Sequence, residues 1–330
     1  MPFQNAEIIN LALDPTANNV TLVRSQMKLV NEDKSWSAMS VKRKTGVGGF
    51  YTQTALGLPN AAARRQIGSS TAPVTTGIEF TKQFKPWEIA GVAVLYHEQV
   101  RDSAGGVLNL TKETQAMLPM SVDMAKQSEF ASVLMNGIQG TVLPPGQVPY
   151  LDTLTGDGLS LFNTAHEYKS SDLTYSNMLD TDTLPSEQAF DDVNTLINGI
   201  QLANGRRAKI NIKRVLCSFD LITANKVVLN SEFTPETNAN AVNKALQIPN
   251  WDIMENPYFS EQFQVWFTDS PEETKMHFVV AEEPNVGDPF VWPDNRSISY
   301  YVNGSFRFQP AVEGGFNCVC NRAALPLQID

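Results

Sequence analysis

The residues of this chain most able to do chemistry lie in one polar stretch, SLFNTAHEYKSSDLTYSN, at positions 160–177. His166 could act as a general base, because imidazole titrates close to neutral pH. Ser170 or Ser171 could then be the nucleophile, and Glu167 could orient the ring. No clear partner for such a site follows downstream, and segments rich in Ser, Thr, Asn and Asp are common in turns for backbone reasons alone. We therefore expect a turn-forming loop rather than a catalytic one.

Three other patterns could carry chemistry, and each has a plainer interpretation. GVGG at 46–49 resembles a phosphate-binding loop only in its glycines, because it lacks the Gly-Lys-Ser/Thr ending and no apolar strand leads into a helix there. The acid pairs Asp191-Asp192 and Glu282-Glu283 are adjacent in sequence. Helix neighbours one apart do not share a face, so the first pair is not a poised dyad. We interpret both pairs as solvated surface.

The histidines and cysteines indicate no clear metal or redox site. His97 follows the apolar run GVAVLY and is expected at a strand end, and His277 is expected as a core histidine in a buried strand. Cys318 and Cys320 are two apart, and the chain has one further cysteine, Cys217. This low, odd count fits a reducing compartment, and buried thiols are the expectation. The sequence thus predicts no catalytic residue, no metal and no cofactor.

Charge is distributed unevenly along the 330 residues. The formal net charge is −10, yet segment 42–85 holds seven basic side chains against the single acid Glu79, a balance of +6. The remainder therefore carries −16. An acidic body with one basic segment is a poor nucleic-acid binder, but its basic part could contact the acidic part of another copy. The basic side chains expected at such contacts are Lys42, Arg43, Lys44, Arg64, Arg65, Lys82 and Lys85.

Length and hydropathy limit the class of protein. A chain of this length forms one large domain or two of ordinary size. No window approaches about eighteen consecutive apolar residues, so no membrane span is expected. The N-terminal residues lack the basic and apolar regions of a secretory signal.

The front of the chain has too little apolar surface for a core of its own. Residues 1–36 are polar, are broken by Pro15, and are expected to form an extended arm. Alternating segments at 34–46 and 75–98 predict strands, with small residues, Gly and Pro between them. Long structureless inserts are rare within a domain, so we interpret 37–92 as a two-stranded projection. An isolated hairpin is marginal in water, so this one should need another surface, which a neighbouring subunit could provide.

A helix is predicted within 106–137. Its apolar positions recur at helical spacing, and Gly137 provides a stop. Pro119 should kink this helix or split off its first turns. A methionine stripe can mark a binding groove, but core packing is the better interpretation. The residues of the predicted face are Met117, Met120, Met124, Ala131 and Leu134.

The second half of the chain alternates helices and strands. Thr183 is the predicted N-cap of a helix with Pro185 in its first turn and Asn204-Gly205 at its end. A third helix is predicted at 218–231. The buried face of the second helix comprises Phe190, Val193, Ile197 and Ile200, and that of the third comprises Leu221, Ala224 and Val228. Strands are expected at 209–218, 251–254, 264–268 and 277–281, and the segment from 297 reads as β-hairpin material.

The order of these elements resembles that of a known family. VAVLYHEQVRDSAGG and the helix after it (92–137) resemble the strand, short turn and long spine helix of tailed-phage major capsid proteins with the Hong Kong 97 (HK97) fold. LFNTAHEYKSS, YSN, LPSEQAF and KRVLCSFDLITANKVVLNSEFTPET are similar, in that order, to the major head subunit of Mu-like phages. The resemblance covers roughly 85–320. It assigns no catalysis to His166, which would be an anchor of a surface loop together with Phe162.

The resemblance implies an α+β HK97-like capsid fold with four parts. These would be an N-terminal arm (1–36), an extended β-hairpin or E-loop (37–92), a peripheral domain with the spine helix (93–139 and 296–330), and an axial domain (140–295). Many copies would assemble into pentamers and hexamers of an icosahedral shell around double-stranded phage DNA. Assembly would take place in the host cytoplasm, with a portal and, in some members, scaffold or decoration proteins as partners.

Two alternatives remain open at this point. An encapsulin-like nanocompartment shell shares the fold but encloses enzymes instead of DNA. A soluble hydrolase would use the loop around His166. The long arm and the extended hairpin favour the virion protein over the nanocompartment shell.

Overall fold

The structure is a computed structural model. It describes residues 35–46, 49–56, 78–96, 110–138, 152–180, 184–230, 251–260, 262–268, 276–287, 290–292, 297–313 and 318–321. Residues 1–34 of the predicted arm, the turn at 98–103 and His97 lie outside these residues, and the last two residues of the predicted arm are part of a short helix. None of the described helices combines the length and apolar composition that a membrane crossing requires.

The larger of two main sheets is built around one long strand, β12. β10 and β11 pair antiparallel along one edge of β12, β4 pairs antiparallel along the opposite edge, and β1 adds parallel to β10. The pairing of Val302 with both Val286 and Gly91 shows these two edges. The strands are β1 (Ser40–Lys44), β4 (Trp87–Tyr96), β10 (Met276–Val286), β11 (Phe290–Trp292) and β12 (Ser297–Pro310).

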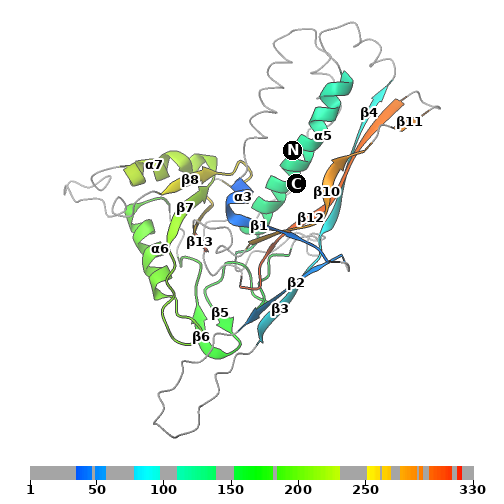
Figure 1. The fold of residues 1–330 in the computed structure, drawn as a ribbon. Helices are drawn as coiled ribbons and strands as arrows, with labels where there is room; N and C mark the ends of the chain where they lie inside the picture. Colours follow the sequence, from blue (N-terminus) through cyan, green and yellow to red (C-terminus); the bar gives the residue numbers. More distant parts are fainter. Residues whose placement is uncertain are drawn as a thin grey trace.

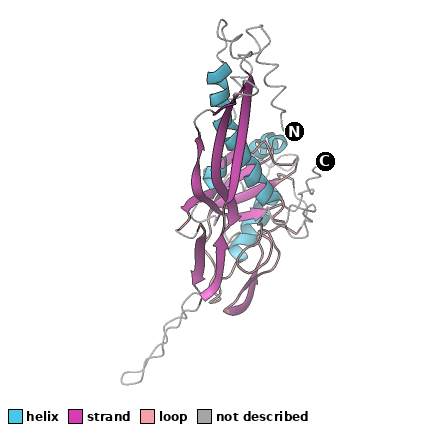
Figure 2. Cartoon of the chain, turned by 90° about the vertical axis from the view of Figure 1, so that its right-hand side faces the viewer, coloured by secondary structure: helices cyan, strands magenta, loops and turns pink. Residues whose placement is uncertain are grey.

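Helix α5 (Leu110–Met135) covers one face of this sheet (Figure 1), and Figure 2, turned by 90°, shows the strands in front of it. Phe130 packs on Phe308 of β12 with ring centroids 5.5 Å apart. Each fully buried side chain of this kind stabilises the fold by about 1.5–3 kcal/mol through the apolar area it removes from water. The α5 side chains buried in this core are Leu118, Val122, Phe130, Ala131, Val133, Leu134 and Met135.

Two expectations for this helix change. Pro119 lies inside α5 and does not split off its first turns, because it removes only one hydrogen bond from a helix whose later turns are fixed by packing, and the alternative of a kink stays a prediction. The three predicted methionines, Met117, Met120 and Met124, are only half-buried, whereas Leu118 and Val122 are 5% and 4% exposed. The buried face is thus rotated relative to the methionine stripe.

The start of the first strand also differs from the prediction. Ser35–Met39 forms a short helix, α3, and the strand begins at Ser40. The apolar residues in this stretch lie on one face of the helix. Trp36 packs on Phe278, with ring centroids 5.0 Å apart, and Met39, three residues later, is fully buried. A single turn shows too few residues for its period to be told from that of a strand.

The smaller main sheet carries two helices and a second core (Figure 1). Its strands lie in the order β13 (Cys318–Cys320), β9 (Gln264–Thr268), β7 (Ile212–Cys217) and β8 (Asp252–Glu255). The helices are α6 (Glu187–Gly199) and α7 (Ile222–Asn230), the latter preceded by a 3₁₀ turn, Phe219–Leu221. The predicted strands at 209–218, 251–254 and 264–268 are confirmed within a few residues, and so is most of the predicted buried face of α6.

The predicted boundaries of α6 are wrong at both ends. Ser186, not Thr183, is the N-cap, and its hydroxyl accepts a 3.1 Å hydrogen bond from the backbone N–H of Ala189. Pro185 therefore precedes the helix. The helix ends at Gly199, because Ile200 is already extended, and Asn204-Gly205 belongs to the next turn.

Two hairpins complete the fold. β2 (Tyr51–Leu56) pairs antiparallel with β3 (Ile78–Phe84) inside the predicted 37–92 segment, whereas β1 and β4 of that segment belong to the larger sheet. β5 (His166–Tyr168) pairs antiparallel with β6 (Ser171–Tyr175) in the opening polar stretch. The two hairpins lie side by side at the lower end of the molecule in Figure 1, where side chains of both line one cavity.

Candidate functional site

His166 begins strand β5 and is fully buried. Its Nδ1 lies 2.8 Å from Asp157 Oδ2, and its Nε2 lies 3.2 Å from the carbonyl oxygen of Leu161. Tyr175 stacks on the ring at a centroid distance of 4.9 Å. Both ring nitrogens are thus engaged with backbone and carboxylate, and neither Ser170 nor Glu167 is a partner. The prediction that His166 is an anchor of a loop is confirmed.

Asp157 is the partner that sequence reasoning missed. Its carboxylate accepts hydrogen bonds from His166, from the Thr155 hydroxyl and, at 3.0 Å, from the Leu159 backbone N–H. Burial raises the pKa of this carboxyl, but the hydrogen bonds from His166, Thr155 and Leu159 outweigh burial and hold the pKa below its usual value. The pair therefore braces the turn at 153–161 and presents no open base to a substrate.

His277 is buried as predicted, and it also contacts the first hairpin. Its Nε2 lies 2.8 Å from Gln53 Oε1 on β2, and the same oxygen accepts a 3.2 Å hydrogen bond from the Val312 N–H. Because the amide oxygen is an acceptor, Nε2 carries the proton. The ring also meets Tyr51 and Phe84 edge-on, with centroids 5.6 and 5.3 Å away.

The base of this hairpin has an apolar anchor on its own chain. Phe84 at the base and Ala55 nearer the described outer end are buried together with Val279 of β10 and Val312, which lies just past β12. The expectation that the hairpin must use a neighbour's surface to become ordered is therefore wrong for its base. At the outermost described pair, Leu56 and Ile78 point away from this cluster and are 66% and 61% exposed, although their neighbours Ala55 and Glu79 are buried.

Ionic contacts reinforce this attachment. Lys82 Nζ lies 3.1 Å from Asp152 Oδ2, and it also donates to the carbonyl oxygens of Leu154 and, at 3.3 Å, Pro310. Burial lowers the pKa of the Lys82 ammonium, and Asp152 acts in the opposite direction. Glu79, near the start of β3, accepts hydrogen bonds from the backbone N–H and hydroxyl of Ser170.

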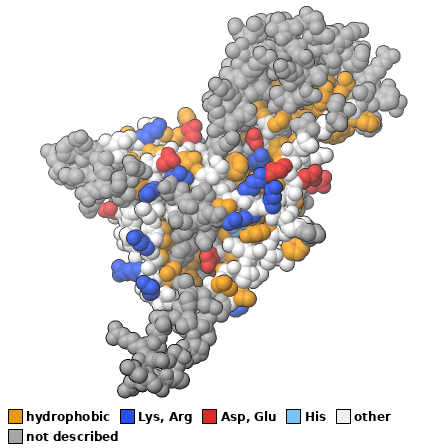
Figure 3. All heavy atoms as spheres, in the orientation of Figure 1, with side chains coloured by type: hydrophobic (Ala, Val, Ile, Leu, Met, Phe, Trp, Pro, Cys, Tyr) orange, Lys and Arg blue, Asp and Glu red, His pale blue; other side chains and the backbone are white. Residues whose placement is uncertain are grey.

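The other predicted contact residues are spread over separate places. Lys42 pairs with Glu283 of its own chain at the surface, and Lys44 and Lys85 are exposed. Arg43 alternates with them on β1 and is half-buried, and Arg64 and Arg65 lie outside the described residues. Figure 3 shows side chains of both charges over the region of β1 and α5.

The remaining patterns have structural roles. In GVGG, the N–H of Gly49 donates to the carbonyl of Gly46, and Gly49 has a φ of 73°, so the two described glycines have a structural role between β1 and β2. Cys318 and Cys320 are fully buried, and burial raises the pKa of both thiols. Burial likewise raises the pKa of Cys217 to about 11. The prediction of buried thiols is confirmed.

Solved structures share this fold, although the sequence matches no protein-family model and no curated protein. The capsid of Ralstonia phage GP4 has a TM-score of 0.56 at 9% identity, over 86% of each chain. A structure of Microbacterium phage Oxtober96 has a TM-score of 0.53 at 10% identity, over 88% of this chain and 90% of that one.

A third structure, the capsid of an empty GTA particle, has a TM-score of 0.51 at 8% identity, over 88% of this chain and 89% of that one. Identities this low leave the Mu-like subfamily a prediction. The chain nevertheless has a mixed α+β fold that it shares, over most of its length, with solved capsid structures of a phage and of a GTA particle.

Proposed function

We propose that this chain is the major capsid protein of a tailed phage. Copies of it would assemble into pentamers and hexamers of an icosahedral shell that encloses double-stranded DNA. The observation that carries this proposal is the likeness to solved capsid structures over 86–88% of the chain. A likeness of this extent leaves little of the described fold for an additional catalytic domain.

The hairpin β2–β3 supports a role in assembly. Its base is fixed to the body by Phe84, Lys82 and Gln53, while its outer end exposes Leu56 and Ile78. A rigid projection with an apolar end can gain order and buried area by lying on a second copy. Repetition of one such contact around a ring closes a symmetric shell.

The finer assignments follow from the same proposal. Residues 1–36 would be the arm, 37–92 the extended hairpin, 93–139 with 296–330 the peripheral domain, and 140–295 the axial domain. α5 would then be the spine helix of the peripheral domain. The chain would work with a portal protein, and with scaffold or decoration proteins where the phage uses them, in a virion assembled in the host cytoplasm.

Basic side chains would fix partner choice at these contacts. Lys44, Lys85, Arg64 and Arg65 are the candidates for pairing with acidic surface on a neighbour. The role of Lys42, Arg43 and Lys82 would be indirect. They would hold β1 and β3 in the positions from which these strands contact a neighbour. Each exposed pair contributes only about 0–1 kcal/mol, so such contacts set register more than affinity.

Electron microscopy of the purified chain tests the proposal. We expect closed, uniform shells, and we expect phage particles that contain this chain to enclose nuclease-protected DNA. Shells filled with an enzyme would favour the nanocompartment instead. A matched variant replaces 57–77 by Asn-Gly, a turn that closes a two-stranded hairpin. This variant should fold but not close shells, and a wild-type chain that stays monomeric under all assembly conditions would refute the proposal.

The hydrolase alternative has a separate test. His166→Ala should lower the stability of the subunit, because it leaves Asp157 buried without its ring partner. Neither this variant nor the wild type should hydrolyse generic esters above the buffer rate. A hydrolytic rate in the wild type that His166→Ala abolishes would favour the enzyme.

A further inference from the structure

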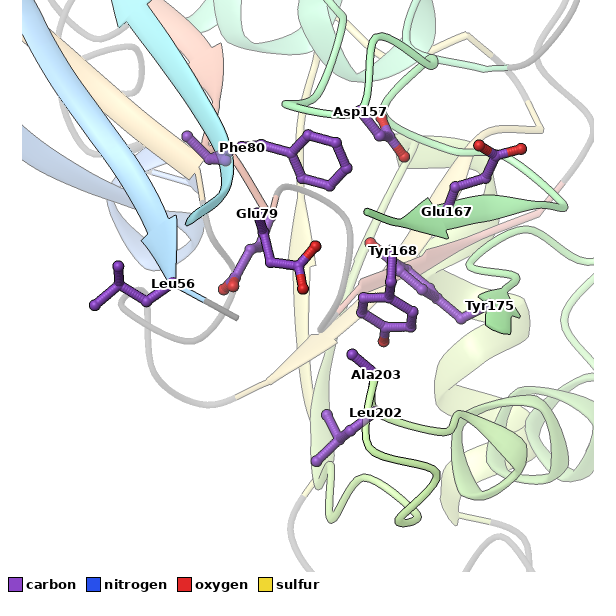
Figure 4. Close-up of a pocket in the computed structure, with 11 residues that line it drawn as sticks. Leu56, Glu79, Phe80, Asp157, Glu167, Tyr168, Tyr175, Leu202 and Ala203 are labelled. Atoms are coloured by element: carbon purple, nitrogen blue, oxygen red, sulfur yellow. The ribbon is translucent and has the colours of Figure 1, made fainter. Parts of the chain in front are cut away.

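A cavity of about 170 Å³ lies between the two hairpins. Figure 4 shows Glu79 and Phe80 of β3 on one side of it, facing Glu167 and Tyr168 of β5 on the other. Tyr175 of β6 adds a second aromatic wall. The space is large enough for a planar side-chain head group, and it opens to the surface beside the exposed Leu56.

The lining carries more negative charge than its own surroundings neutralise. Four carboxylates reach it: Glu79, Asp157, Glu167 and Glu313. Asp157 is engaged by His166, but among the described residues no Lys, Arg or His pairs with Glu79 or Glu167. Glu79 is only 6% exposed, and its hydrogen-bond partners among the described residues are the neutral N–H and hydroxyl of Ser170. A carboxylate buried to this degree normally lies beside a cation.

The aromatic walls are fixed and uncharged. The Tyr168 hydroxyl donates a 3.0 Å hydrogen bond to the carbonyl of Gln201, which holds the ring in place. Burial, and then the charges of Glu313 and Glu79, raise the pKa of Tyr168 well above its usual value, so the phenol stays protonated. Tyrosine faces attract guanidinium groups, and carboxylates bind the planar guanidinium fork in pairs.

We propose that this cavity receives the guanidinium of Arg64 or Arg65 from a second copy of the chain. The inference rests on the proposed function, because it requires copies to lie side by side. It adds to that function a receptor on one subunit, formed by the base of its hairpin and by β5–β6. The contact would supply the missing counter-charge for Glu79 and Glu167.

Charge and reach select this occupant. In the segment between β2 and β3, residues 57–77, the two arginines are the only charged residues. A strand continued from Leu56 would carry Arg64 up to roughly 26 Å from the cavity of its own chain. To reach the cavity of its own chain, the segment after Leu56 would have to turn back. The same segment of a second copy placed beside the first could reach that cavity without turning back. Arginine also suits the site better than lysine, because its flat head group can stack on Tyr168 while it binds carboxylates.

Cross-linking between two differently tagged chains tests the proposal. One chain carries Glu167→Cys and the other carries Arg65→Cys, and a short bismaleimide is applied to mixed particles. We expect a heterodimer at several-fold higher yield than in a control mixture with Asp172→Cys, an exposed residue of the same hairpin that does not line the cavity. Arg64→Cys gives the parallel measurement for the other candidate. The native cysteines of the chain are buried and serve as an internal background.

A charge reversal provides a second readout. Glu167→Arg should reduce the yield of closed particles several-fold, and adding Arg64→Glu and Arg65→Glu should restore part of it. Particles that form normally without the heterodimer would overturn the inference and leave the proposed function intact. A third chain would carry both Glu167→Cys and Arg65→Cys. Cross-links found only within that chain would overturn the inference, because the cavity would then receive the arginine of its own chain. A wild-type chain without particles would overturn the proposed function, and the inference with it.

Discussion

Lys82 on β3 places its ammonium 3.1 Å from the carboxylate of Asp152, seventy positions later in the sequence. Asp152 also accepts a 2.8 Å hydrogen bond from the side-chain amide of Gln309 near the end of β12. The projecting hairpin, the segment after α5 and the central strand of the larger sheet therefore meet at one carboxylate.

Removal of Asp152 should loosen the hairpin. The side chains of Lys82 and Asp152 are 11% and 25% exposed, so Asp152→Asn leaves a largely buried ammonium without its counter-ion. We expect a loss of about 2–4 kcal/mol in the free energy of unfolding, at the lower end of buried pairs because water still reaches Asp152. Urea unfolding of the unassembled subunit measures it. The double variant Lys82→Met with Asp152→Asn should recover part of the loss, and equal losses in both variants would argue against the ion pair.

Asp157 should make the subunit sensitive to acid. Its native pKa lies below that of the unfolded chain, so the native state binds fewer protons, and stability falls as the pH falls through the native pKa. The contribution is complete above about pH 4. Asp157→Asn should cost about 1–3 kcal/mol at pH 7. Urea unfolding from pH 7 down to pH 3 should show the wild-type and variant curves converging, and a constant gap would contradict this role.

Glu129 should act in the opposite direction. Burial raises its pKa from its usual 4.5 to about 7, although the Phe308 N–H and the charge of Arg307 oppose the shift. The native state then binds more protons than the unfolded chain between these values, so stability falls as the pH rises from 4.5 to 7. Glu129→Gln should remove up to about 3 kcal/mol of this loss.

Thermal unfolding at pH 5 and pH 8 measures the effect of Glu129. The variant should gain stability over the wild type at pH 8 and gain little at pH 5. Asp123→Asn on the same helix is the matched control, because Asp123 is 37% exposed and pairs with Lys126 at 2.9 Å. This change should alter stability by about 0.5 kcal/mol or less at either pH.

Periodic elements with one apolar face could be predicted from the sequence. α6, α7, β7 and β9 bury a stripe or a run that a short window already shows. Contacts between distant segments could not. The partner of His166 lies across a turn that needs Gly158 at a φ of 80°, and neither the conformation nor the pairing leaves a local pattern. Lys82 was predicted to contact a neighbour, because a basic residue in a basic segment gives no sign of burial.

The prediction of the first residue of α6 was wrong for a different reason. Thr183 and Ser186 are both good N-cap residues, and intrinsic preference does not separate them. Packing decides between them, because Ala189 and Phe190 must enter the core with the first turn of α6. The long hairpin was predicted to lack any anchor since its apolar residues, such as Phe84, are few and widely spaced. Few apolar residues of the hairpin are needed for this anchor, because Val279 and Val312 of the body complete the apolar cluster around Phe84 and Ala55.

The cap of α6 can be tested directly. Ser186→Ala removes the oxygen that accepts from the Ala189 N–H and should cost about 1 kcal/mol. Thr183→Ala is the control and should leave the free energy of unfolding unchanged, because the helix begins after it. Urea unfolding of the two variants compares them, and a larger loss for Thr183→Ala would place the cap where the sequence pattern suggested.

Gly156 should be sensitive to the smallest added side chain. A Cβ at this position would lie 2.5 Å from Val312 Cγ1, 2.7 Å from the Val312 carbonyl oxygen and 3.0 Å from Phe80 Cβ. The backbone N–H of Gly156 also donates a 2.8 Å hydrogen bond to that carbonyl, so the clash and the bond compete for the same space. Gly156→Ala should cost about 1–3 kcal/mol through overpacking. Gly199→Ala is the control, since no atom within 4 Å would meet its Cβ and alanine favours the helix end. If chemical unfolding found the two variants equally stable, Gly156 would not hold Phe80 and the hairpin against the body.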